Sequence, residues 1–189
     1  MKSKFNISVN NGYSKSIVFV NATENLSDRI SNGVDFSLEN TKKDVIDILV
    51  GVEFNRTNTQ YSINSEFNQT FFTTTYFADL TVDVKRWSFN TTFDYNNYTG
   101  NAFDTDQIIP ILQASISRQM LESKKAELKL SAYDILNKNI GFDRSSNLNY
   151  LQEQRTNNLS RYFMLSLFYK IGQQGEKEDM QWGGRRRKK

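Results

Sequence analysis

Apolar and polar residues alternate along eight separate stretches of the chain. In residues 161–172, Phe163, Leu165, Leu167 and Tyr169 form an apolar row, and the residues between them form a mixed row. Because successive side chains of an extended backbone point to opposite faces, this period of two predicts β-strands. The predicted strands cover residues 3–13, 29–39, 44–55, 70–84, 87–95, 108–119, 126–136 and 161–172. The chain is therefore predicted to be all-β.

One stretch fits a second interpretation. The Glu and Lys residues between positions 117 and 130 have a spacing that would also suit a helix with pairs four residues apart. That helix remains an open alternative. Pro110 is compatible with the predicted strand 108–119, because proline is tolerated near the start of a strand.

The links between the predicted strands are alternately long and short. The long links cover about 14–29, 57–69, 99–107 and 137–157, and the short ones lie at 40–43, 85–86 and 121–125. An antiparallel up-and-down meander puts every second link on the same side, and transmembrane barrels have short periplasmic turns and longer external loops. We therefore predict an up-and-down transmembrane β-barrel. Its periplasmic side holds Asn40, Lys85, Ser123 and both chain ends.

Charge is nearly absent from the apolar rows. Arg56, Arg118 and Asp134 are the charged residues in phase with these rows, and each lies at the end of a segment. A lipid-facing row should look like this, because Lys or Arg at the bilayer midplane costs roughly 2–4 kcal/mol. A sandwich core also excludes charge, so a soluble all-β module that binds a carbohydrate or another ligand remains the alternative.

Segment length favours lipid over a second sheet. Strands of globular proteins usually have about 5–6 residues, whereas strands that span a membrane need about 9–11. Most of the predicted segments are in the longer class. The positions predicted to face lipid in the last two strands are Leu128, Leu130, Phe163, Leu165, Leu167 and Tyr169.

The opposite row is rich in acids. Those predicted to face the lumen are Asp35, Asp47, Glu53, Asp79, Asp83, Asp94 and Glu127. An eight-stranded barrel is just wide enough to be filled by its own side chains, and unpaired carboxylates buried there would be costly. The eight strands are therefore predicted to form an arc of a wider barrel with a hydrated lumen. A cation site at Asp79, Asp83 and Asp94 is less favoured than hydrated acids, since oxygen-only sites need six or more converging ligands.

Composition removes most routes to catalysis. The 189 residues contain no cysteine and no histidine, which excludes disulfides, thiolate or imidazole metal sites and imidazole-based triads. We predict no enzyme and no cofactor. The net charge of +3 comes from the final RRRKK, because residues 1–184 sum to −2. No basic face with interleaved aromatics is evident, so nucleic acid is not an expected partner. No apolar run is long enough for a transmembrane helix.

The carboxy-terminal region resembles a known family. The strand ELKLSAYDILN is followed by a long polar loop, by Arg155, Asn157 and Leu159, by RYFMLSLFY and by a tail rich in Gly and Arg. This combination resembles the closing hairpin of the large outer-membrane β-barrels of Bacteroidetes that are related to TonB-dependent receptors. The similarity extends over residues 3–172.

The resemblance implies a barrel of about 22 strands, an amino-terminal plug, and uptake of a scarce nutrient such as an iron chelate or a glycan. Its partners would be outer-membrane lipid, the rest of the barrel, the plug, and TonB through that plug. The sequence shows no signal peptide, plug or TonB-contacting segment, so the chain is expected to be a fragment of a transporting parent. Residues 1–171 would be the barrel segment and 172–189 a disordered basic periplasmic tail. The ligand is not predicted.

Overall fold

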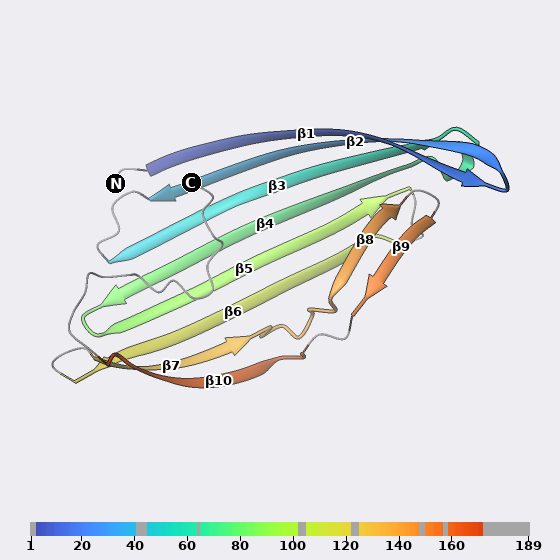
Figure 1. The fold of residues 1–189 in the computed structure, drawn as a ribbon. Coiled ribbons are helices and arrows are strands. Elements are labelled where there is room, and N and C mark those ends of the chain that lie inside the picture. The colour runs from blue at the N-terminus through green and yellow to red at the C-terminus, as the bar shows by residue number, and fades with distance from the viewer. Residues whose placement is uncertain are drawn as a thin grey trace.

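The computed structural model describes residues 3–40, 45–63, 65–101, 105–121, 125–147, 150–156 and 159–171. They form one antiparallel sheet of eight strands and a separate two-stranded sheet (Figure 1). The large sheet consists of β1 (Ser3–Val20), β2 (Thr23–Asn40), β3 (Ile46–Tyr61), β4 (Gln69–Val84), β5 (Trp87–Gly100), β6 (Gln107–Met120), β7 (Ala126–Tyr133) and β10 (Tyr162–Tyr169). The small sheet pairs β8 (Phe142–Asn147) with β9 (Tyr150–Arg155). The predicted tail, 172–189, lies outside the described residues.

The strand order confirms the up-and-down meander. The neighbours in the large sheet are β1-β2-β3-β4-β5-β6-β7-β10, and each pair is antiparallel. With an even number of strands, β1 starts and β10 ends at the same edge as the links β2–β3, β4–β5 and β6–β7. We call this edge the terminal end and the opposite edge the loop end. The assignment of the terminal end to the periplasm stays a prediction.

The helix alternative for residues 117–130 is wrong in the described part of that stretch. Here β6 and β7 pair directly, with Ile116 opposite Leu130 and Ser117 opposite Lys129. The charged residues that have a helical spacing therefore lie on strands and at their ends. In the described ranges the one helix is the 3-10 turn η1 (Ser65–Phe67), and no helix there is long and apolar enough to cross a membrane.

The long link predicted at residues 14–29 is also wrong. Strands β1 and β2 continue through this region and meet in a two-residue turn at Asn21 and Ala22, whose φ angles are 49° and 62°. Positive φ at both central residues is typical of a type I′ hairpin turn, which matches the twist of paired strands. The alternation was hidden because Lys15 and Asp28 fall on the otherwise apolar row, where they lie directly opposite each other.

The other links at the loop end are real, although shorter than predicted at two places. Residues 62–68 join β3 to β4 and include η1, and residues 101–106 join β5 to β6. The link between β7 and β10 is long and contains the β8–β9 hairpin. At the terminal end, Lys85 and Arg86 form the turn between β4 and β5. Ser123 and residues 41–44 lie outside the described part of the chain.

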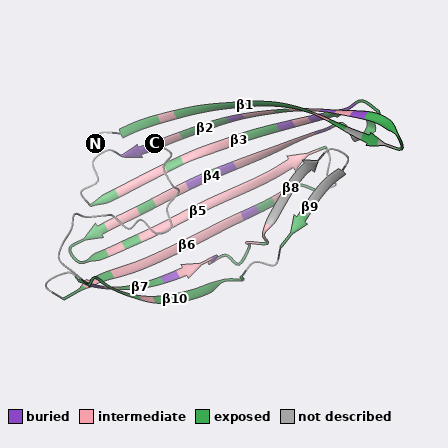
Figure 2. Ribbon diagram, viewed as in Figure 1, coloured by how far each residue is buried: buried purple, intermediate pink, exposed green. Residues whose placement is uncertain are grey.

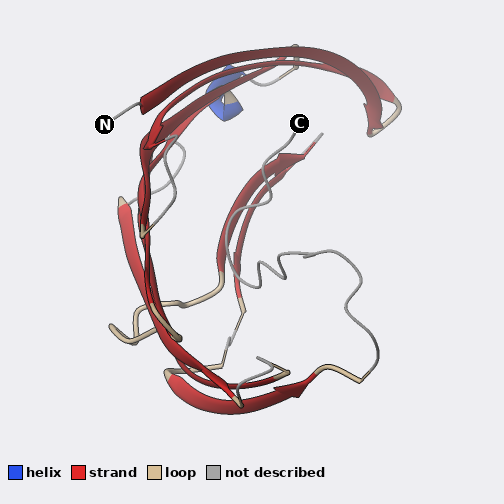
Figure 3. Cartoon of the chain, turned by 90° about the vertical axis from the view of Figure 1, so that its left-hand side faces the viewer, coloured by secondary structure: helices blue, strands red, loops and turns tan. Residues whose placement is uncertain are grey.

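The large sheet curves into an open arc (Figure 3), and the β8–β9 hairpin lies on the inner side of that arc. Strands β1 and β10 are its two edges, and no pairing joins them within the described ranges. Figure 2 shows these edge strands as mostly exposed, whereas the central strands β5 and β6 are largely of intermediate burial. The sheet therefore has the curvature of a barrel wall and is not closed.

Close packing on the inner side of the arc centres on Gly51 of β3. Gly51 lies opposite Phe77 of β4, whose side chain is buried. A Cβ atom at Gly51 would be 2.4 Å from Phe77 Cζ and 2.4 Å from the backbone oxygen of Phe36. The ring of Phe77 thus occupies the space that a side chain at Gly51 would need.

Replacing Gly51 with alanine is expected to lower the free energy of unfolding by about 1–3 kcal/mol, because the ring and the strand must move apart. Gly12→Ala is a matched strand control with an expected effect below about 1 kcal/mol. Its added Cβ would meet only the rotatable Ser31 Oγ, at 2.7 Å. Chemical denaturation in detergent measures both. Equal losses at the two glycines would contradict this packing argument.

Candidate functional site: the two faces of the sheet

One face of the sheet is a continuous apolar surface. The register brings apolar residues of successive strands into lines that run across the sheet. One such line is formed by Ile46, Val82, Phe89, Ile116, Leu130 and Leu165. A second is formed by Ile7, Phe36, Val52, Tyr76 and Tyr95. The apolar rows of separate strands therefore form one surface, which is a property that only pairing can establish.

This apolar face is exposed. The exposed fraction is 41% for Phe36, 47% for Leu130 and 68% for Leu165. Soluble monomers rarely expose apolar patches larger than a few hundred Å², whereas this surface extends over all eight strands. No second sheet packs on it within the described ranges, since the β8–β9 hairpin lies on the inner side of the arc (Figure 3). The described residues thus form a single curved layer on this side and not the two packed layers of a sandwich.

All six residues predicted to face lipid lie on this face. Leu128 is opposite Leu167, and Leu130 is opposite Leu165. Phe163 and Tyr169 lie on the same side of β10, opposite two alanines of β7. Their exposed fractions run from 37% to 70%. The structure thus brings the six together, and their contact with hydrocarbon remains a prediction.

Charged residues bracket the apolar face at a separation that matches a bilayer. Asp106 precedes β6 and Arg118 lies near its end, twelve residues later. All positions in phase between them are uncharged: Ile108, Pro110, Leu112, Ala114 and Ile116. At about 3.4 Å per residue this distance is about 41 Å along the strand. A tilt of about 35–45° reduces it to roughly 30 Å, which is the thickness of a hydrocarbon core.

Trp87 and Arg118 form the boundary of this band at the terminal end. They are register partners on β5 and β6, and the guanidinium carbon of Arg118 lies 5.1 Å from the centre of the Trp87 ring. Phe89 stacks on the same indole, with ring centres 6.4 Å apart. A cation over an aromatic face is favourable, and aromatic side chains with long basic ones are typical of membrane interfaces. Arg118 thus lies at the end of the apolar row of β6, and the middle of that row carries no charge.

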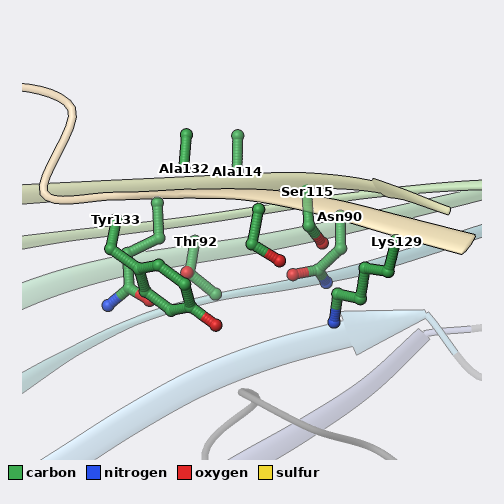
Figure 4. A pocket seen from close by; sticks show the side chains of 9 residues that line it. Asn90, Thr92, Ala114, Ser115, Lys129, Ala132 and Tyr133 are labelled. Carbon is green, nitrogen blue, oxygen red and sulfur yellow. The ribbon is translucent and has the colours of Figure 1, made fainter. Parts of the chain in front are cut away.

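The other face is polar and lies on the inside of the arc. Figure 4 shows Asn90, Ser115 and Lys129 pointing to one side of the sheet, while Ala114 and Ala132 point to the other. The register explains this arrangement, because Asn90, Ser115 and Ser131 share one line and Ala114 pairs with Ala132 on the next. Hydroxyl and amide side chains dominate this face, which is that of the β8–β9 hairpin (Figure 3).

All seven predicted acids fall on the polar face. Their positions are in phase with those of the side chains seen in Figure 4: Asp35, Asp47, Glu53, Asp79, Asp83, Asp94 and Glu127. Asp35 and Glu53 lie directly opposite each other. Asn10 donates a hydrogen bond to Asp35 (3.2 Å). Like charges in cross-strand positions are destabilising, so this face suits a wet environment. That the environment is a lumen remains a prediction.

The structure does not bring Asp79, Asp83 and Asp94 together as a cation site. Asp79 and Asp83 are four residues apart on one strand, about 13 Å. Asp94 lies opposite Phe77, on a different line from either. In the described ranges no group of three or more acidic side chains is close enough to hold a metal ion. Glu39, also on the inner face, lies 3.7 Å from Lys4 Nζ.

Sequence reasoning missed the role of Asp134. Strand β7 ends at Tyr133, three residues earlier than predicted, and Asp134 adopts a positive φ of 46°. Its buried carboxylate accepts hydrogen bonds from the backbone N–H groups of Lys138 (3.0 Å) and Asn139 (3.1 Å). The segment DILNKN is therefore a capped turn at the loop end. An Asp followed by polar turn residues was the available signal.

Comparison with known proteins adds one match. A family model described as an outer membrane protein beta-barrel family matches residues 2–169. No curated protein and no solved structure matches the chain. The matched region includes every strand of the large sheet.

Proposed function

Because the chain belongs to an outer membrane protein β-barrel family and is thus located in the outer membrane, we propose that it forms part of a transport barrel. The transporter would be of the TonB-dependent receptor type found in Bacteroidetes. It would take up a scarce nutrient, such as an iron chelate or a glycan. Outer-membrane lipid would contact the apolar face, and the solute would pass along the polar one.

The observation that carries this proposal is that the outer face of the sheet is apolar and the inner face is polar, which is the reverse of a soluble protein. The outer face exposes large apolar side chains such as Phe36 and Leu165, and the inner face carries the hydroxyls, amides and acids. Acids that lie directly opposite each other, such as Asp35 and Glu53, would be costly in the packed interior of a narrow barrel. A wide, water-filled barrel accommodates them, and wide barrels with plugs are those of outer-membrane transporters.

The unpaired edges define the structural partners in this proposal. In hydrocarbon every backbone N–H and C=O group must be paired, so open sheet edges do not occur there. The outer edges of β1 and β10 have no strand partner within the described ranges. We assign them to further strands of the same transporter, whose plug would contact TonB. Members of this family are typically not enzymes, and we propose no catalytic role.

The proposal is tested by deleting the gene that encodes the chain and measuring growth on a panel of iron chelates and glycans as limiting nutrients. Growth on at least one nutrient is expected to fail, and complementation should restore it. Loss of TonB should reproduce the same defect. Growth that is unchanged on every nutrient would overturn the transport role, and uptake that persists without TonB would overturn the energised mechanism.

A further inference from the structure

A polar pocket lies on the inner face across β5, β6 and β7 (Figure 4). Its hydrogen-bonding side chains come from all three strands: Asn90, Thr92, Gln113, Ser115, Lys129, Ser131 and Tyr133. The register sets this arrangement, because Asn90, Ser115 and Ser131 lie on one line and Thr92 and Gln113 on the next. Residues from three strands thus present amide, hydroxyl and ammonium groups to one small space.

The Ser131 hydroxyl has an unused hydrogen-bonding capacity. The side chain is 3% exposed, and its oxygen has no hydrogen-bond partner within the described part of the chain. A buried hydroxyl without a partner is costly and rare in folded proteins. A ligand that presents an acceptor oxygen to the pocket would remove that cost. The hydroxyl is therefore available to a ligand oxygen placed in the pocket.

The charge of the pocket indicates which acceptor fits. Lys129 is the cation of its lining, and no carboxylate lines it. Lys129 forms no ion pair within the described ranges, and serines lie opposite it on both neighbouring strands. Glu127 lies two positions earlier on the same face, outside the lining. Asp79, the register partner of Thr92, also lies outside the lining, so the one charge within the lining is positive and favours an anionic group.

The size and border of the pocket limit the ligand further. The space is about 30 Å³, which is room for about one or two water-sized groups. A carboxylate fits there, and the rest of its molecule must remain outside. The border is formed by Tyr133, whose ring stacks on that of Tyr162 with centres 4.6 Å apart and planes at 16°. Such a fixed aromatic face packs well against the C–H face of a sugar ring.

We propose that this pocket binds the carboxylate of a sugar acid, with the sugar ring against Tyr133. Lys129 and Ser131 donate to the carboxylate oxygens, and the amides of Asn90 and Gln113 are within the same lining. Asn90 already donates to Thr81 Oγ1 (2.9 Å), which fixes the orientation of its amide. This inference names a substrate class for the transport barrel and so rests on the proposed function.

Equilibrium binding of glucuronate to the full chain in detergent micelles tests the site. Glucose and acetate are the comparison probes, and isothermal titration calorimetry is the readout. Glucuronate is expected to bind about tenfold more tightly than either probe, since it alone has both the carboxylate and the ring. Equal affinities for glucuronate and glucose would overturn the anion site. Equal affinities for glucuronate and acetate would overturn the sugar contact.

Variants assign the binding to these side chains. Lys129→Gln is expected to raise the Kd for glucuronate about tenfold, and Ser131→Ala about threefold to tenfold. Ser88→Ala is the matched control, because Ser88 lies on the same face of β5 outside the lining and should leave the Kd unchanged. Unchanged binding in Lys129→Gln would refute the site. Binding in micelles does not depend on TonB. If glucuronate binds but deletion of the gene causes no growth defect, the transport role is refuted and the binding site is not.

Discussion

Arginine in place of Phe36 is expected to lower the free energy of unfolding from lipid by about 2–4 kcal/mol, the cost of a cation near the bilayer midplane. Phe36 lies on the apolar face, between Ile7 and Val52 in register. It is 41% exposed and makes an edge-to-face contact with Phe5, with ring centres 4.4 Å apart. Guanidinium denaturation of vesicle-inserted protein, followed by tryptophan fluorescence, gives the value.

Ser37→Arg is the matched control, because it adds the same charge to the adjacent residue on the opposite face. Ser37 accepts a weak hydrogen bond from Asn6 (3.4 Å), so its loss is expected to cost less than about 1 kcal/mol. A penalty at Phe36 that exceeds the one at Ser37 is the expected pattern. Equal penalties at the two positions would mean that the apolar face is not the one that meets lipid.

Removal of the Asp134 carboxylate is expected to lower the free energy of unfolding by about 2–4 kcal/mol. In Asp134→Ala the backbone N–H groups of Lys138 and Asn139 lose their acceptors, and hydrogen bonds to a charged group contribute roughly 1.5–3 kcal/mol each before relaxation. The turn also anchors β10, since Arg161 donates from its backbone to Asn137 Oδ1 (3.1 Å) and from its guanidinium to the Ile135 carbonyl (3.2 Å).

The variant Asp134→Asn is expected to have an intermediate effect on stability. Asp134→Asn keeps one acceptor oxygen and should lose about half as much stability as Asp134→Ala. Asp106→Ala removes an exposed carboxylate at the same end of the sheet and should change stability by less than about 0.5 kcal/mol. Denaturation and limited proteolysis of the β7–β10 link measure the outcome. An alanine variant as stable as the Asp106 control would show that the carboxylate does not hold this turn.

The Phe36 prediction follows from the position of polar groups relative to two solvents, lipid at the apolar face and water at the inner face. On the apolar face, charge is confined to the edges, as at Arg118 beside Trp87. On the inner face, charge is common, and two acids even lie directly opposite each other at Asp35 and Glu53. At the loop end, strands β1 and β2 continue to a turn beyond the apolar band, so Lys15 and Asp28 can occupy the outer row. These positions are the ones expected if the apolar face meets lipid and the inner face meets water.

The alternation of residue types determined which side chains share a face, because a strand turns each successive side chain to the opposite side whatever its partners are. That local rule placed Leu128 and Phe163 on the apolar face and Asp79 on the polar one. It also identified the all-β fold and the short turn at Lys85 and Arg86. It failed at residues 14–29, where a charged pair across two strands interrupts the pattern.

Only the tertiary structure decided which residues lie opposite one another. Register, curvature and the ends of strands depend on pairing between segments far apart in the chain, and no local period encodes them. Pairing joins Asn90, Ser115 and Ser131 into one line, and the early end of β7 lets Asp134 cap a turn. The sequence by itself determined which side chains share a face, because the alternation of side chains is a property of each single strand. The pocket and the register were decided by the structure, because they are properties of several strands together.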